Sequence, residues 1–118
     1  MGSTLREERM APNRYLGEFE QMVLLAILQT GEEANGYAVR RMLEEDAGRS
    51  VSKGAFYTTL DRLESKGYLT WELREPTGDR SDLPQRHFSV TPAGIEELKR
   101  SRRALLTLWS GLEGVLDG

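Results

Sequence analysis

The sequence contains no cysteine, a single histidine and four prolines, and it has no long run of apolar residues. Without cysteine the chain can form neither a disulfide framework nor a thiolate metal site. One histidine leaves too few nitrogen ligands for a zinc site built by the protein. The apolar runs are too short for a membrane span, and the first residues lack the apolar core of a signal peptide. We therefore expect a cytoplasmic protein without a metal site or cofactor.

Side chains that could carry enzyme chemistry are also sparse. An enzyme site needs a nucleophile, a base and oxyanion-stabilising groups that converge. The one histidine, His87, falls in a predicted strand beside a polar loop, a pattern typical of a surface residue. A glycine-rich loop that could hold phosphates after a strand is missing as well. The chain is therefore not expected to be an enzyme.

The length of the chain bears on its number of domains, and its charge bears on its partners. A chain of 118 residues predicts one domain. A small domain buries a smaller fraction of its surface than a large one, so a partner subunit would help to stabilise it. The net charge of −3 argues mildly against a nucleic-acid partner. However, residues 49–66 carry four cations against two acids, and residues 86–103 carry five against two. The positive charge therefore gathers in two segments of an acidic chain.

Residues 52–69 are the most informative segment. Ser52 can cap a helix through its hydroxyl, and Gly67 can end it. An apolar stripe at helical spacing consists of Phe56, Leu60 and Leu63. The opposite face is small and polar and consists of Gly54, Ala55, Thr58, Arg62 and Ser65, with Lys53 and Tyr57 at its edge. Such a face can lie close to a polyanion and donate to phosphates or base edges, although an ordinary solvated helix would look similar.

The elements around this helix predict the fold. Apolar periodicity predicts a first helix over residues 15–30 and a second over residues 36–46, capped by Asn35. Two alternating strands follow, joined by the polar loop 75–85: residues 68–73 with Leu69, Trp71 and Leu73 on one face, and residues 86–90 with Phe88 and Val90 inward. This order predicts a mainly α fold with a small two-stranded β-wing, the winged helix-turn-helix, whose reading helix enters the DNA major groove.

The C-terminal segment predicts a long helix. Thr91 is an N-cap residue followed by proline at the first helical position. We expect the helix to run to about residue 116, which is about 39 Å if unbroken, although Gly111 and Gly114 are poor helix formers and suggest fraying or close helix approach. Leu98, Leu105 and Leu112 repeat every seven residues, with Leu108, Trp109 and Leu116 beside them. An exposed seam of this kind favours a partner helix. We therefore expect a polar tail (residues 1–14), a DNA-binding domain (15–90) and a dimerisation helix (91–118).

Several segments together resemble the PadR family of bacterial transcriptional regulators. They are residues 16–17, 23–28, 35–39, 52–69 and 88–94, and the likeness extends over roughly residues 15–118. The sequence departs from the family pattern at Thr58, where the family often has proline. The wing also departs, because it carries Asp79 and Asp82 and has few glycines and cations.

The resemblance implies a homodimeric repressor that binds an inverted-repeat operator in double-stranded DNA. The dimer would form through the C-terminal helix, with the first helix contributing. The implied DNA contacts are Ser52, Lys53, Gly54, Ala55, Tyr57, Thr58, Arg62 and Lys66 in the reading helix, Tyr37 in the second helix, and Arg80 and Arg86 in the wing. The expected dimer interface consists of Leu98, Leu105, Leu108, Trp109, Leu112 and Leu116.

Two other functions stay open at this point. In the first, the protein is a sensor, and Trp109 and its leucine neighbours hold a flat aromatic effector between two C-terminal helices. A tryptophan in this place can equally be simple core. In the second, the winged fold is a protein-interaction module that binds no DNA, against which the cations of the reading helix argue.

Overall fold

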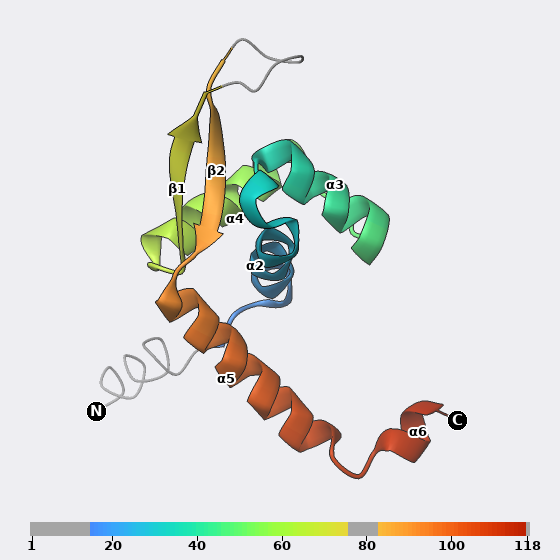
Figure 1. Ribbon diagram of the computed structural model, residues 1–118. Helices are drawn as coiled ribbons and strands as arrows, with labels where there is room; N and C mark the ends of the chain where they lie inside the picture. Colours follow the sequence, from blue (N-terminus) through green and yellow to red (C-terminus); the bar gives the residue numbers. More distant parts are fainter. Residues whose placement is uncertain (1–14, 76–82, 118) are drawn as a thin grey trace, which may run out of the picture.

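The computed structural model describes residues 15–75 and 83–117. Its elements are α2 (Glu18–Thr30), the short 3-10 helix η1 (Gly31–Glu33), α3 (Gly36–Ala47), α4 (Lys53–Ser65), β1 (Leu69–Arg74), β2 (Gln85–Val90), α5 (Pro92–Trp109) and α6 (Glu113–Asp117). Helices α2, α3 and α4 pack together beside the two strands, and α5 extends away from them (Figure 1). This arrangement confirms the predicted fold class. The expected tail and Arg80 lie outside the described residues.

Helices α2 and α3 begin at side-chain caps. Helix α2 starts later than the predicted residue 15, because the extended Gly17 is its N-cap and donates its N–H to Glu20 Oε1 at 2.9 Å. Helix α3 begins after Asn35, as predicted, and the Asn35 side chain accepts from the Ala38 N–H at 2.8 Å. Gly48 ends α3 in the left-handed conformation, with φ of 61°.

Helix α4 begins and ends where the sequence predicts. The Ser52 hydroxyl accepts from the Ala55 N–H at 3.1 Å. At the other end Gly67 has φ of 82°, and the Tyr68 N–H donates to the Leu63 carbonyl at 3.0 Å. This pattern is a Schellman motif, in which a left-handed glycine turns the chain out of the helix. The chain then enters β1 directly, so the position of α4 and the position of the sheet are tied together.

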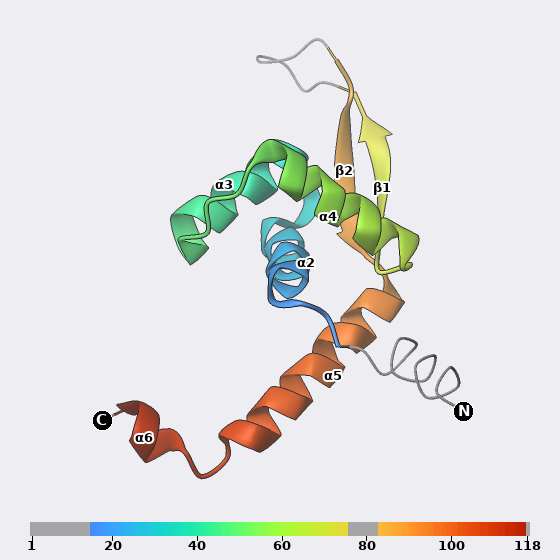
Figure 2. The same cartoon turned by 180° about the vertical axis from the view of Figure 1, so that it is seen from behind.

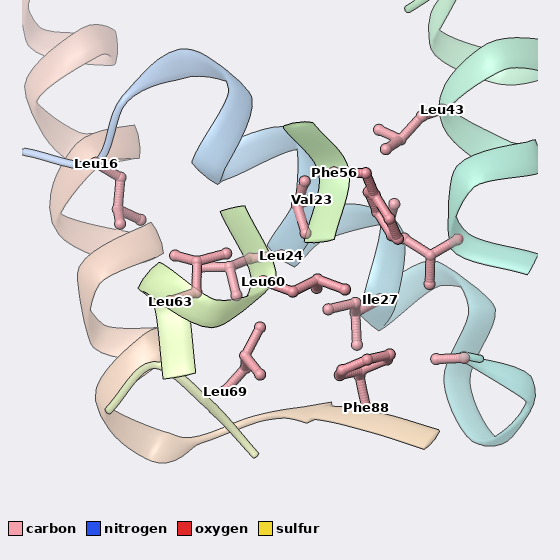
Figure 3. Packing of buried hydrophobic residues seen from close by; sticks show 13 residues of the cluster. Leu16, Val23, Leu24, Ile27, Leu43, Phe56, Leu60, Leu63, Leu69 and Phe88 are labelled. Carbon is pink, nitrogen blue, oxygen red and sulfur yellow. The ribbon is translucent and has the colours of Figure 1, made fainter. Parts of the chain in front are cut away.

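The core lies where α2, α3 and α4 meet the two strands. Figure 3 shows side chains from α2, α3, α4, β1 and β2 converging on one centre. The stripe predicted on α4 belongs to it: Phe56, Leu60 and Leu63 are all buried. Its other labelled members are Leu16, Val23, Leu24, Ile27, Leu43, Leu69 and Phe88. Because one face of α4 is used for packing, its polar face is left outside.

The two strands pair in an antiparallel ribbon, with Leu69 opposite Val90 and Trp71 opposite Phe88. Leu69 and Phe88 are buried as predicted. Leu73 shares a face with Leu69 in the alternating pattern, but its side chain is 62% exposed. The half of β1 nearer the polar loop, residues 72–74, is exposed.

The expectation that the C-terminal helix runs to about residue 116 is wrong, and the break falls at Gly111, one of the two glycines that the sequence marks as poor helix formers. Helix α5 ends at Trp109, and Ser110 leaves the helical region with ψ of 127°. Gly111 follows with φ of 85°, and the chain turns before the short helix α6 (Figure 2). Glycine adopts this conformation at no steric cost and is a poor helix former. The heptad row therefore stops at Leu105, and Leu112 lies in the turn.

Helix α5 is joined tightly to the turn after α4. The Thr91 hydroxyl accepts from the Gly94 N–H at 3.1 Å and donates to the Gly67 carbonyl at 2.6 Å. The Thr91 N–H donates to the Tyr68 carbonyl at 3.0 Å. Gly94 is buried against the same carbonyl, and a Cβ at this position would overlap both the Tyr68 oxygen and the Val90 side chain. The start of α5 is therefore fixed to the end of α4.

Candidate nucleic-acid interface

The first half of α4 presents an open face. Ser52, Lys53, Gly54, Ala55 and Thr58 are exposed, as the sequence predicts. A Cβ placed on Gly54 would meet nothing within 4 Å, so another molecule can approach the backbone there. Within the described ranges 15–75 and 83–117, Lys53 takes part in no ion pair. This surface combines a free cation with little steric bulk, which suits contact with a polyanion.

Arg86 connects the wing to α4. Its guanidinium lies 5.0 Å from the ring centroid of Trp71, 5.8 Å from that of Tyr57 and 5.9 Å from that of Phe88. Guanidinium groups are attracted to aromatic faces at such distances. No carboxylate in the described part of the chain pairs with Arg86. The cation therefore sits at the base of the wing with its position fixed by rings and its charge not neutralised by a neighbouring acid.

A cleft of about 220 Å³ opens beside Arg86. Its lining includes Asn35, Gly36 and Tyr37 from the start of α3, Tyr57 from α4, and Gln85, Arg86 and Phe88 from β2. Gly36 leaves room for the Tyr57 side chain, because a Cβ at position 36 would overlap the Tyr57 hydroxyl. The structure thus brings Tyr37, Tyr57 and Arg86 together, although they come from three elements. Their hydroxyl and guanidinium donors suit the oxygens of a phosphate.

Two of the predicted contacts, Arg62 and Lys66 at the end of α4, lie near Glu20 of α2. Lys66 Nζ donates to Glu20 Oε2 at 2.8 Å. Arg62 lies farther from the same oxygen, at 4.0 Å, and its side chain is 52% exposed. Glu20 is buried, and sequence reasoning missed it. The spacing Gly17-x-x-Glu20 could have identified Glu20 as the residue that accepts the N-cap N–H of α2, but not its pairing with Lys66.

Glu20 is held in its charged form by these neighbours. Burial raises the pKa of its carboxyl, but hydrogen bonds from Lys66 and the Gly17 N–H, together with the charges of Lys66 and Arg62, outweigh burial. The pKa of Glu20 is therefore below its usual value of 4.5. At neutral pH Glu20 is therefore a carboxylate.

The one histidine lies in β2 and contacts the 3-10 helix η1. His87 Nδ1 lies 3.0 Å from the Glu32 carbonyl oxygen, which fits a role in the structure. Within residues 15–75 and 83–117, acidic side chains and histidine form no group of three that could hold a metal ion. In the same ranges, every helix is too short or too polar to cross a membrane.

The apolar side chains of the C-terminal segment are largely uncovered. Five of the six expected interface residues are exposed, by 44 to 73%: Leu105, Leu108, Trp109, Leu112 and Leu116. The sixth, Leu98, packs against the core. A groove of about 520 Å³ lies between α5 and α2, and its lining includes Leu25, Leu28, Ile95, Leu105 and Trp109. An exposed apolar surface of this kind marks an interaction site.

Helices α2, α3 and α4 and the antiparallel pair of strands together form a winged-helix fold. Residues 24–100 match the PadR-like family of transcriptional regulators, and the chain belongs to this family. Its class is therefore that of DNA-binding transcriptional regulators and not that of enzymes.

Two curated relatives share part of the sequence. An uncharacterized 37.1 kDa protein in transposon TN4556 of Streptomyces fradiae is 34% identical over 88 residues, which are 75% of this chain and 23% of that protein. The transcriptional regulator Rv3488 of Mycobacterium tuberculosis is 43% identical over 58 residues, which are 49% of this chain and 50% of that protein. The chain thus spans half or less of the length of these relatives.

Solved structures share the fold. A PadR-like transcriptional regulator from Bacillus cereus has a TM-score of 0.67 at 22% identity, over 85% of this chain and 92% of that one. A PadR-like transcription factor from Bacteroides fragilis has a TM-score of 0.63 at 20% identity, over 97% and 96% of the two chains. At such identities the comparison shows the fold alone.

Proposed function

We propose that this protein is a cytoplasmic transcriptional repressor that binds an inverted-repeat DNA operator as a homodimer. The exposed first half of α4 carries this proposal, because its small residues and its free Lys53 lie next to a cleft lined by Tyr57 and Arg86. A helix of this shape fits the major groove, and donors at its edges fit the phosphates on either side.

The proposed DNA contacts fall into two groups. Ser52, Lys53, Gly54, Ala55, Tyr57, Thr58 and Arg62 would meet the major groove and its edge, and Tyr37, Arg80 and Arg86 would meet the flanking backbone. Arg86 supports this role, because the rings of Trp71 and Tyr57 hold its guanidinium and leave its charge unpaired among the described residues. Lys66 is not in either group, because its ammonium donates to the buried Glu20.

The proposed dimer uses the exposed apolar side chains of α5 and α6 together with the groove beside α2. Leu105 and Trp109 both line this groove, and both are nearly half exposed. Covering them with a second copy would remove apolar surface from water, at about 25 cal/mol for each Å² buried. A two-fold dimer would then present two α4 helices to the two half-sites of an operator.

Fluorescence anisotropy with labelled DNA from upstream of the protein's own gene tests the proposal. We expect tight binding that weakens steeply with salt, and Lys53→Gln should reduce the slope of log affinity against log salt by about one. Arg103→Gln, which removes one exposed cation from α5, is the matched control. Two results would contradict the proposal. One is a salt slope that Lys53→Gln leaves unchanged, and the other is an affinity for the upstream DNA that is no higher than that for random DNA.

A second candidate function is regulation by a planar aromatic effector. The groove between α2 and α5 supports it, because it has room for a small molecule, and Trp109 forms part of its wall. In a Trp71→Phe variant, Trp109 is the remaining tryptophan. We expect 1-anilinonaphthalene-8-sulfonate, an aromatic anion that does not intercalate into DNA, to quench its fluorescence and weaken DNA binding. If neither signal changes, the groove has no such role.

A further inference from the structure

Glu20 holds an unusual position between α2 and α4. Among the residues that the structure describes, it is the one acidic or basic residue that is buried, with 7% of its surface exposed. Its Oε1 accepts the Gly17 N–H, and its Oε2 accepts the ammonium of Lys66. A buried carboxylate costs free energy unless it is paired and hydrogen-bonded, and here both oxygens have partners.

The contact joins parts of the chain that are 46 residues apart. Lys66 is the C-cap residue of α4, immediately before the glycine turn that leads into β1. The same turn receives the Thr91 hydroxyl from the start of α5, through the Gly67 carbonyl at 2.6 Å. Glu20 therefore fixes to α2 the point at which the reading helix, the wing and the C-terminal helix meet.

We propose that Glu20 is a positioning residue for DNA binding, and that Lys66 serves this contact and not a DNA phosphate. The inference rests on the proposed function, because it concerns how the reading helix is oriented toward DNA. The Lys66 ammonium donates to a buried partner at 2.8 Å, so moving it away toward a phosphate would leave that carboxylate without its main partner. Arg62 has no such constraint, since its 4.0 Å separation from Glu20 is too long for a hydrogen bond.

Glu20 and Lys66 differ in burial, so removing one or the other should cost a different amount of stability. The Glu20 side chain is 9% exposed, whereas that of Lys66 is 42% exposed. Lys66→Gln leaves a buried carboxylate without its main partner, whereas Glu20→Gln leaves an ammonium that water can reach. We therefore expect Lys66→Gln to lower Tm more than Glu20→Gln, and the double variant to have a higher Tm than Lys66→Gln alone.

Circular dichroism melts at neutral pH measure this order. Glu18→Gln is the matched control, since Glu18 lies on the same helix and pairs with Arg49, but its side chain is 80% exposed. Its Tm should stay close to that of the wild type. Additive Tm losses for Glu20→Gln and Lys66→Gln would overturn the proposed contact.

DNA affinity at several salt concentrations, at a temperature where every variant is folded, tests the positioning role. Glu20→Gln and Lys66→Gln should each lower the affinity severalfold with an unchanged salt slope, whereas Lys53→Gln should reduce the slope by about one. A Lys66→Gln slope that falls by one would show a phosphate contact and overturn the inference. Unchanged affinity in both variants would also overturn it.

Failure of the proposed function gives a different result. In that case the wild type has no affinity for its own upstream DNA above that for random DNA, and Lys53→Gln has no effect. The positioning role then falls with the function, while the melting experiment still decides whether Glu20 and Lys66 are coupled.

Discussion

Replacing Gly94 with alanine tests the joint between α5 and the reading helix. The added Cβ would overlap the Tyr68 carbonyl oxygen and the Val90 side chain. The oxygen belongs to the backbone and also accepts the Thr91 N–H at 3.0 Å, so it cannot move aside without breaking that bond. Overpacking of this kind costs about 1–3 kcal/mol, and the upper part of that range applies to a backbone clash.

Alanine also gains about 1 kcal/mol over glycine inside a helix, so the expected net loss for Gly94→Ala is about 1–2 kcal/mol. For a domain of this size each kcal/mol shifts Tm by about 4–8 °C. Gly54→Ala is the matched control, because Gly54 is also helical and a Cβ there meets nothing within 4 Å. Denaturant or thermal melts should show Gly54→Ala stabilised and Gly94→Ala destabilised. Equal stability of the two variants would refute the reasoning.

Three further predictions follow from other parts of the structure. Leu105→Asp places a carboxylate in the proposed dimer surface and should give monomers by light scattering at micromolar concentration, whereas Leu73→Asp on the wing should leave dimers; a monomeric wild type would contradict this prediction. Arg86→Lys keeps the charge but loses the planar stacking on Trp71 and Tyr57, so DNA affinity should fall, and an unchanged anisotropy titration would argue against the role of the stack. The lowered pKa of Glu20 makes its ionised form stabilising above the unfolded value of 4.5, and this stability is lost as the pH falls through the folded pKa. The Tm difference between wild type and Glu20→Gln should therefore be present at neutral pH and disappear in acid, and a difference that persists in acid would contradict the pKa argument.

Local signals in the sequence correctly predicted where α3, α4 and α5 begin. The caps at Asn35, Ser52 and Thr91 depend on a side chain and an N–H three residues later, so the relevant atoms are close in the chain. The apolar stripe of α4 was equally accessible, because helical spacing alone puts Phe56, Leu60 and Leu63 on one face. These features gave the fold class before any tertiary contact was known.

Two departures from the sequence patterns have a common physical origin. The heptad pattern favoured a continuous helix past Gly111, although the left-handed conformation of that residue ends it. Leu73 alternates like Leu69 and Trp71, but the pattern carries no information about how far the core extends beneath the ribbon. In both cases a local pattern extends beyond the region where packing supports it.

The candidate site was predictable only in part. The open residues of α4 followed from its polar face. The stack of Arg86 on Trp71 and Tyr57 depends on strand pairing and on the distance between β2 and α4, which a single sequence does not specify. Glu20 was missed because its partner Lys66 lies far along the chain, so no local spacing reveals the pair.

The central claim is that two reading helices of one dimer bind the two halves of an operator together. Inserting about five base pairs at the dyad, half a helical turn, places the half-sites on opposite faces of the duplex. Footprinting and anisotropy should then show affinity reduced to that of a single half-site, whereas substituting the dyad base pairs at constant spacing should preserve most of it. Undiminished affinity after the insertion would contradict the account.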